Sequence, residues 1–259
     1  IKMIYSCFKT KFTITSIIIL LFLSSCVSKK EVVYFQNAKD FETMVDTDTF
    51  TPKFKVNDII SVYVSTFDMD ASRPFNLSKD GGNNNNTEFL DYLIDNEGNI
   101  DYPVLGKIKL LGLSVQEAQE LFKDKLALYL KDPIVNIRIL NFRISVLGEV
   151  GSPGMYEVSG ERITILEALA LAGDLTIKGQ RENILVVRDF NGTKTYTRVD
   201  LTNKELFNSP VYYLTQNDTI YVEPNNSAVS GASGDMRIST IISISSFLVT
   251  TALIFVTRR

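Results

Sequence analysis

The chain has 259 residues, with 27 Lys and Arg against 30 Asp and Glu, and a net charge of −3. It contains no His and only two Cys, which excludes nucleophilic sites that use His as a base and the usual His/Cys zinc sites. The sequence has no basic patch interleaved with aromatic residues, so nucleic acid is not an expected partner. We expect no metal, no cofactor and no catalytic residue.

The first 25 residues have the parts of a secretory signal peptide. Three Lys precede an apolar run at 17–23 that is too short to cross a membrane, and small residues follow this run. The motif L-S-S-C then ends at Cys26. It resembles a bacterial lipobox, in which the Cys is diacylated and becomes the new first residue. Val27 implies transfer to the outer membrane. A chance Cys after an ordinary signal peptide is the alternative.

A polar tether and a strand are expected next. Residues 26–52 contain few apolar side chains, and we expect at most one short strand in them. Asn57 and Asp58 predict a turn, and the β-branched residues that follow predict a strand reaching Val64. Residues 66–88 include four consecutive Asn and too few apolar residues to pack, which predicts a mobile loop.

A turn and a helix follow in the same module. The segment 96–99 contains a Gly and separates two short β-type runs, which predicts a hairpin. Ser114 and Glu117 form a capping box, and apolar residues then recur with the helical period. Pro133 ends this helix. Alternating apolar residues at 135–139 predict a half-buried strand.

A second module of strands with one short helix is expected at 141–224. Thr164 and Glu167 form another capping box, and Gly173 is the residue expected just after the end of the helix. The dipeptide at 191–192 is Asn-Gly, a strong signal for a hairpin between its flanking strands. This mixture of elements predicts a compact α+β unit.

One short pattern occurs twice. The sequence N-D-x-I-x-V stands at 57–62 and again at 217–222. Both copies predict a turn followed by a strand. A true structural repeat and a shared turn-and-strand composition are both compatible with six matching residues.

The C-terminal segment is apolar over the length of a membrane. It carries no charge between 238 and 256, and a helix of about 19 residues is roughly 28 Å long, close to the hydrocarbon thickness of a bilayer. Hydroxyl residues recur on one helical face, namely Ser239, Ser243, Ser246 and Thr250. One interpretation is a plain anchor, since Ser and Thr bond to their own helix. The other is the wall of a pore.

The order of these pieces resembles a known family. Residues 55–64, 93–106 and 112–118 look like the polysaccharide biosynthesis/export domain, and residues 146–158 and 165–173 look like the soluble-ligand-binding β-grasp (SLBB) domain. Behind a lipobox and before an amphipathic helix, they resemble the outer-membrane polysaccharide export lipoproteins of capsule and exopolysaccharide systems. Three departures are Asn57 and Asp174 in place of Gly, and room for one β-grasp domain only.

The resemblance implies an α+β fold and a defined organisation. The expected parts are a signal peptide at 1–25, a lipidated tether at 26–52, an export domain at 53–140 with a mobile loop at 66–88, a β-grasp domain at 141–224, a linker at 225–236 and a transmembrane helix at 237–259.

The resemblance also implies a function without catalysis. Copies of the chain would form a homo-oligomeric ring, for example an octamer, and polysaccharide would leave through its helical barrel. Ser239, Ser243, Ser246 and Thr250 would face the lumen, where hydroxyls solvate a sugar chain without holding it tightly. The implied partners are the polysaccharide, outer-membrane lipid and an inner-membrane co-polymerase or tyrosine kinase. The body would lie in the periplasm, lipid-anchored to the outer membrane at Cys26.

Two other functions remain open at this point. The first is a periplasmic lipoprotein that binds glycan or scaffolds an envelope complex, with the C-terminal segment as a simple anchor. The second is a hydrolase, because Asp95, Glu97 and Asp101 lie close enough in sequence for a glycosidase with two carboxylates. Acidic residues around a hairpin are more often solvated turn residues.

Overall fold

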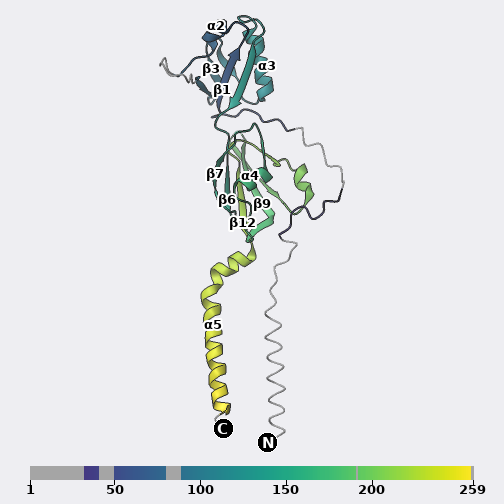
Figure 1. Cartoon of the computed structure of the whole chain (residues 1–259), viewed down its shortest axis with the longest axis vertical. Coiled ribbons are helices and arrows are strands. Elements are labelled where there is room, and N and C mark those ends of the chain that lie inside the picture. The colour runs from purple at the N-terminus through teal and green to yellow at the C-terminus, as the bar shows by residue number, and fades with distance from the viewer. Residues whose placement is uncertain (1–31, 41–49, 80–88, 191, 258–259) are drawn as a thin grey trace.

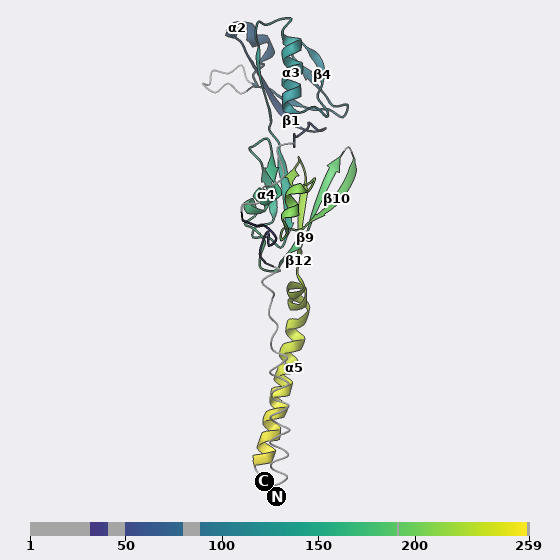
Figure 2. The same cartoon turned by 90° about the vertical axis from the view of Figure 1, so that its right-hand side faces the viewer.

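Two α+β domains lie one above the other along the long axis of the molecule, and a long helix projects from the second (Figures 1 and 2). The computed structural model describes residues 32–40, 50–79, 89–190 and 192–257. Each domain has its own cluster of buried apolar side chains. The mixed α+β class expected from the sequence is therefore confirmed.

The first domain is built on a three-stranded antiparallel sheet in the order β2-β1-β5, with β3 and β4 as a separate hairpin. Its elements are β1 (Ile59–Ser65), α2 (Met69–Ser72), η2 (Arg73–Phe75), β2 (Asp91–Leu93), β3 (Asn99–Tyr102), β4 (Gly106–Lys109), α3 (Val115–Leu126) and β5 (Ile134–Ile139). The predicted capping box at the start of α3 is confirmed, because Ser114 and Glu117 bond to each other's backbone N–H groups. Helix α3 buries Ala118, Phe122 and Leu126 in the domain core.

The hairpin predicted around 96–99 is wrong in its pairing. The turn exists, since the N–H of Asp95 donates to the carbonyl of Asn99. However, β2 pairs with β1, and β3 pairs with β4 across a turn at 103–105. Apolar alternation marks a strand but does not say which strand lies beside it, because pairing depends on non-local packing.

The loop expected at 66–88 is partly ordered. Asp68 caps α2, and Phe75 in η2 is only 3% exposed. The side chain of Asn76 bonds to both the N–H and the carbonyl of Val64 in β1. One buried aromatic residue and one bridging amide thus fix a segment of low apolar content. Residues 80–88, which include the four Asn at 83–86, lie outside the described residues.

The second domain has a five-stranded sheet in the order β10-β9-β12-β6-β7, with one face covered by α4. Its elements are β6 (Arg143–Gly148), β7 (Gly154–Glu157), β8 (Ile163–Thr164), α4 (Ile165–Leu171), β9 (Gly179–Phe190), β10 (Thr193–Val199), η3 (Lys204–Asn208), β11 (Tyr213–Leu214) and β12 (Thr219–Pro224). The capping box of Thr164 and Glu167, and Gly173 with a φ of 76° after α4, are as predicted. So is the β9–β10 hairpin that turns at Gly192.

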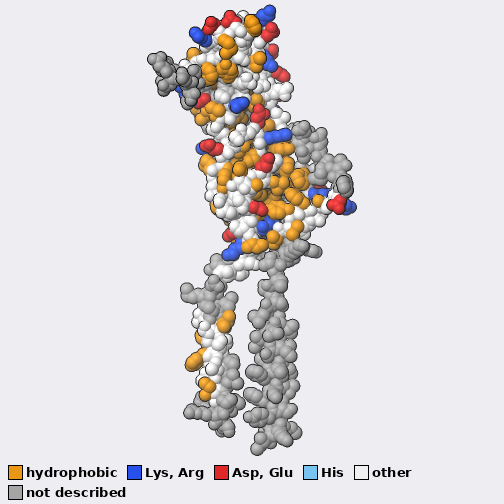
Figure 3. Space-filling model, viewed as in Figure 1, with side chains coloured by type: hydrophobic (Ala, Val, Ile, Leu, Met, Phe, Trp, Pro, Cys, Tyr) orange, Lys and Arg blue, Asp and Glu red, His pale blue; other side chains and the backbone are white. Residues whose placement is uncertain are grey.

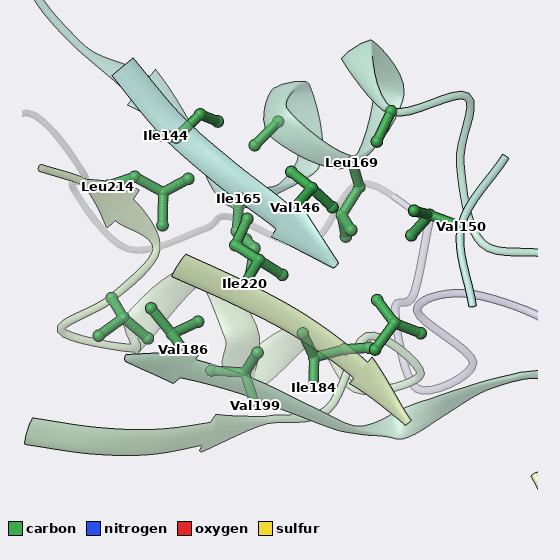
Figure 4. Packing of buried hydrophobic residues seen from close by; sticks show 14 of the residues in the cluster. Ile144, Val146, Val150, Ile165, Leu169, Ile184, Val186, Val199, Leu214 and Ile220 are labelled. Atoms are coloured by element: carbon green, nitrogen blue, oxygen red, sulfur yellow. The ribbon is translucent and has the colours of Figure 1, made fainter. Parts of the chain in front are cut away.

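Apolar side chains from the sheet and from α4 meet in one core (Figure 4). Val146 and Ile220 from neighbouring strands lie between Leu169 of α4 and Ile184 of β9, and all are almost fully buried. Each side chain of this size contributes about 1.5–3 kcal/mol when it leaves water. This core holds the sheet as one rigid piece from which the C-terminal helix departs.

Helix α5 (Asn226–Thr257) begins two residues after β12. The linker expected at 225–236 is therefore wrong. The side-chain oxygen of Asn225 accepts the N–H of Ala228, which caps a helix that continues through the Ser- and Gly-rich stretch.

The expected transmembrane helix at 237–259 is not supported. Within the described ranges, no helix is both long and apolar enough to cross a membrane.

Candidate functional site

The repeated N-D motif forms the same turn twice. Asn57 and Asn217 both adopt left-handed backbone conformations, with φ of 68° and 65°. Among residues other than Gly, Asn is one of the few that adopts this region readily. The turn thus keeps its shape although Asn57 replaces the Gly expected from the family.

The Asp side chain of each turn accepts a hydrogen bond from the backbone N–H of the residue three positions before it. An Oδ2 oxygen of Asp58 accepts the N–H of Lys55 at 2.8 Å, and Oδ2 of Asp218 accepts the N–H of Thr215 at 2.8 Å. The matching backbone angles and bonds show that the repeated pattern is one structural unit used twice.

The two turns meet where the domains join. The Lys55 ammonium group donates to the Thr215 hydroxyl at 2.8 Å and to the carbonyl oxygen of Gln216 at 3.2 Å. The amide of Gln216 in turn bonds to the backbone of Asn141 and Arg143, where one domain continues into the next. These bonds connect the first domain to the second domain.

The two Asp carboxylates differ in charge compensation. Asp218 is fully buried and forms an ion pair with Arg188 at 2.8 Å. Asp58 is 1% exposed and forms no ion pair within the described residues, and its Oδ1 has no hydrogen bond. Burial raises the pKa of Asp58 to about 6, although the N–H and the charge of Lys55 oppose this rise.

The acidic residues around the first turn do not form a catalytic pair. Asp95 accepts the N–H groups of Glu97 and Asn99 at 2.9 and 2.8 Å, which is the geometry of an Asx turn. The bond from Asn99 lowers the pKa of the Asp95 carboxyl, whereas a glycosidase acid needs a raised pKa. In the described segments, no group of His, Cys, Asp or Glu is placed to hold a metal ion.

The hydroxyl face of α5 is partly described. Ser246 donates to the carbonyl of Ile242 at 2.8 Å, and Thr250 donates to the carbonyl of Ser246 at 2.7 Å. Ser243 lies one turn before Ser246 on the same face of α5. The side chain of Ser239, and Cys26 altogether, lie outside the described residues.

Sequence reasoning missed a docked N-terminal segment. Residues 32–40, which we call the N-terminal strap, lie against the second domain. The N–H groups of Phe35 and Gln36 donate to the carbonyls of Leu201 and Thr202 at 3.2 and 2.7 Å, and the Phe35 ring stacks on Phe207 at 5.2 Å. The run V-V-Y-F at 32–35 was the available signal.

A second contact of the strap lies near the start of α5. The hydroxyl of Tyr34 donates to Asp174, and the buried Arg181 guanidinium lies over the Tyr34 ring at 5.8 Å. Burial, with the Asp174 carboxylate next, raises the pKa of Tyr34. Val32 shares a small cleft with 225–227, the residues that begin α5. Val32, the first described residue of the strap, and the start of α5 therefore lie at the same place on the domain.

Comparisons with known proteins assign both domains of the chain to described families. Residues 49–140 match the family described as polysaccharide biosynthesis/export protein, and residues 143–198 match the SLBB domain. Both domains that the motifs predicted are therefore confirmed, and together with the relatives described below they support membership of the polysaccharide export family. Members of this family are non-enzymatic transport components, which confirms that the chain is not an enzyme.

Two curated proteins are similar in sequence to this chain. The EPS I polysaccharide export outer membrane protein EpsA of Ralstonia solanacearum is 28% identical over 156 residues, which is 58% of this chain and 41% of that protein. The protein of the same name from Ralstonia nicotianae is 33% identical over 110 residues, or 41% and 28% of the two chains. The matched parts span less than half of these relatives. Both are named as outer-membrane proteins, which confirms the predicted outer-membrane localisation.

Proposed function

We propose that several copies of this protein assemble into an oligomeric channel that exports a capsular polysaccharide or exopolysaccharide through the outer membrane. The two family domains and the names of the relatives support a role in export. The oligomer is inferred from α5. This helix projects from the folded domains (Figure 1), with exposed apolar side chains along its length.

The exposed side chains of α5 carry this proposal. Ile241, Ile244 and Phe247 are 65%, 54% and 71% exposed, and Ile254 is 54% exposed. An apolar helix surface of this extent needs neighbours to cover it. Figure 3 shows apolar side chains on α5 well away from the apolar surface of the second domain. Copies of α5 packed side by side would cover these residues and turn the hydroxyl face inward.

In this arrangement Ser239, Ser243, Ser246 and Thr250 line the lumen. Hydroxyls already bonded to their own helix keep one acceptor position open, so a sugar chain finds weak and replaceable partners. Such contacts favour passage over retention.

Acylation of Cys26 would attach the membrane lipid to the end of the molecule from which α5 projects. Val32 stands six positions after Cys26, and an extended chain of that length reaches about 20 Å. Because Val32 lies beside the start of α5, an acyl group at Cys26 stays near the first turns of α5. The lipid and the helix bundle would then act at one membrane surface.

The opposite end of the molecule offers a surface for the inner-membrane co-polymerase or tyrosine kinase. Figure 1 places α2 at that end, and exposed apolar side chains of the segments next to α2 and after α3 line one shallow hollow there. Phe67 is fully exposed, and Met69 and Ile134 are 58% and 59% exposed. This end is the farthest from α5, so it faces away from the outer membrane in the proposed assembly.

Cysteine labelling tests the channel. Single Cys substitutions at Ser243, Ser246 and Thr250 should react with a water-soluble, membrane-impermeant reagent in cells, and the bulky label should reduce polymer export. Matched substitutions at Ile241 and Ile244, on the other side of α5, should react poorly. Equal labelling on all sides would contradict a lumen. It would favour a periplasmic glycan-binding or scaffolding lipoprotein with a plain helical anchor, a reading that the hydroxyl bonds within α5 also allow.

A further inference from the structure

The five-stranded sheet of the second domain ends in two open edges. In the order β10-β9-β12-β6-β7, the described residues give β10 and β7 one neighbouring strand each. Figure 2 shows the β9–β10 hairpin projecting from the body, and Figure 1 shows β7 at the left side of the second domain. An exposed edge of this kind presents unpaired N–H and C=O groups to another strand. Neither edge strand contains Pro to block such pairing.

The two edges run in opposite directions. Strand β12 is parallel to β6, β9 is antiparallel to β12, and β10 is antiparallel to β9, so β10 runs in the direction of β6. Strand β7 is antiparallel to β6. Copies related by rotation about an axis parallel to the strands keep their strand directions. Edge β10 of one copy therefore meets β7 of the next as an antiparallel pair, the more stable type.

The orientation of the strands relative to the long axis is also compatible with a closed ring. They run roughly along the long axis of the molecule, the direction of α5 (Figures 1 and 2). The open edges consequently face sideways. Two different edges that meet head to tail form a heterologous interface, which closes into a ring when the rotation permits.

The side chains on the two edges are complementary. The outward positions of β10 include Lys194 and Tyr196, and those of β7 are Met155 and Glu157. Tyr196 is 67% exposed and Met155 is 61% exposed. Within the described residues, Lys194 and Glu157 form no ion pair. One antiparallel register places Tyr196 opposite Met155 and, two residues on, Lys194 opposite Glu157.

We propose that copies of this chain join edge to edge, with β10 of one copy pairing antiparallel with β7 of the next, and that Lys194 opposite Glu157 of the neighbouring copy sets the register. This inference rests on the oligomer proposed above and assigns the interface that builds it. Opposite charges and aromatic pairs directly across two strands stabilise a ladder, and like charges destabilise it. The ring would then be closed by continuous sheet pairing within the domain that carries α5.

Disulfide trapping tests the register. In the full-length protein in its membrane, Tyr196→Cys combined with Met155→Cys should give a ladder of covalent oligomers under oxidising conditions, because Cβ atoms of directly opposed residues lie about 5 Å apart. The matched control is Tyr196→Cys with Tyr221→Cys, since Tyr221 is exposed on the same sheet but lies on its central strand β12. That control should remain monomeric on a denaturing gel.

Charge reversal tests the same contact without a thiol. Lys194→Glu alone and Glu157→Lys alone should each weaken assembly about fivefold or more, since each places like charges opposite each other. The double variant should recover assembly. A wild-type oligomer whose β10–β7 variants neither cross-link nor respond to charge reversal would overturn edge pairing but leave the export channel standing. A monomeric wild-type protein would overturn both.

Discussion

The ammonium group of Lys55 lies 2.8 Å from the hydroxyl of Thr215, although 160 residues separate them in sequence. Each belongs to one of the two N-D turns, so a repeated local motif supplies both sides of the domain junction. The half-buried position of Lys55 lowers its pKa, chiefly through burial, and the charge of Asp218 opposes that effect. The junction is thus a set of partly buried polar contacts between two separately packed cores.

Removing the Lys55 ammonium group should uncouple the domains. Lys55→Met keeps the apolar stem and loses three hydrogen bonds, and bonds to a charged group contribute about 1.5–3 kcal/mol. Denaturant unfolding should show a lower midpoint and separate transitions for the two domains. Lys125→Met on the exposed face of α3 is the control. A single unshifted transition in Lys55→Met would contradict this role.

The Asp58 carboxyl should make stability depend on pH. Its folded pKa of about 6 lies above the value of 3.8 expected when unfolded, so the protonated form favours folding. This contribution is present below pH 3.8 and is lost as pH rises through about 6. Asp58→Asn should therefore gain stability relative to wild type at pH 7, by about 1–3 kcal/mol, and little at pH 4. Equal differences at both pH values would exclude a raised pKa.

The matching substitution in the other turn should act in the opposite direction. Asp218→Asn leaves the guanidinium of Arg188 without its ion-pair partner in a mostly buried position. Breaking such a pair costs about 3–5 kcal/mol. Thermal unfolding at pH 7 should show a large loss for Asp218→Asn, beside a gain for Asp58→Asn. If both variants were stabilised, or both destabilised, the two Asp carboxylates would not differ in how their charges are compensated.

The N-terminal strap should detach when its aromatic contacts are removed. Phe35→Ala removes the stack on Phe207, and Tyr34→Phe removes the bond to Asp174. Backbone amides at Phe35 and Gln36 should then exchange hydrogen faster, and proteases should cut the strap sooner. The control is Phe67→Ala, because Phe67 is fully exposed in the first domain. Unchanged exchange in both strap variants would show that backbone bonds alone hold this segment.

Local chemistry made much of the fold predictable from sequence. Capping boxes at Ser114 and Thr164 fixed the starts of two helices, since each satisfies N–H groups that no other residue reaches. The Asn-Gly hairpin and both N-D turns also follow from residues adjacent in sequence. The family assignment depended on the order of these local signals.

Features that depend on distant contacts could not be predicted in the same way. Strand β2 pairs with β1 because the first sheet needs a third strand there, and no nearby residue signals this choice. The strap begins with the apolar run V-V-Y-F, but the partner of Phe35 is Phe207, far along the chain, and no local signal names it. Helix α5 starts earlier than expected because a single Asn225 cap outweighs a Gly- and Ser-rich composition.

The oligomeric mass of the purified full-length protein tests the central proposal most directly. The protein should be extracted from outer membranes in mild detergent and its mass determined by light scattering with the detergent contribution subtracted. The account predicts one closed oligomer of defined size, which Lys194→Glu dissociates and the added Glu157→Lys restores. A protein that remains monomeric at every concentration measured would contradict the channel.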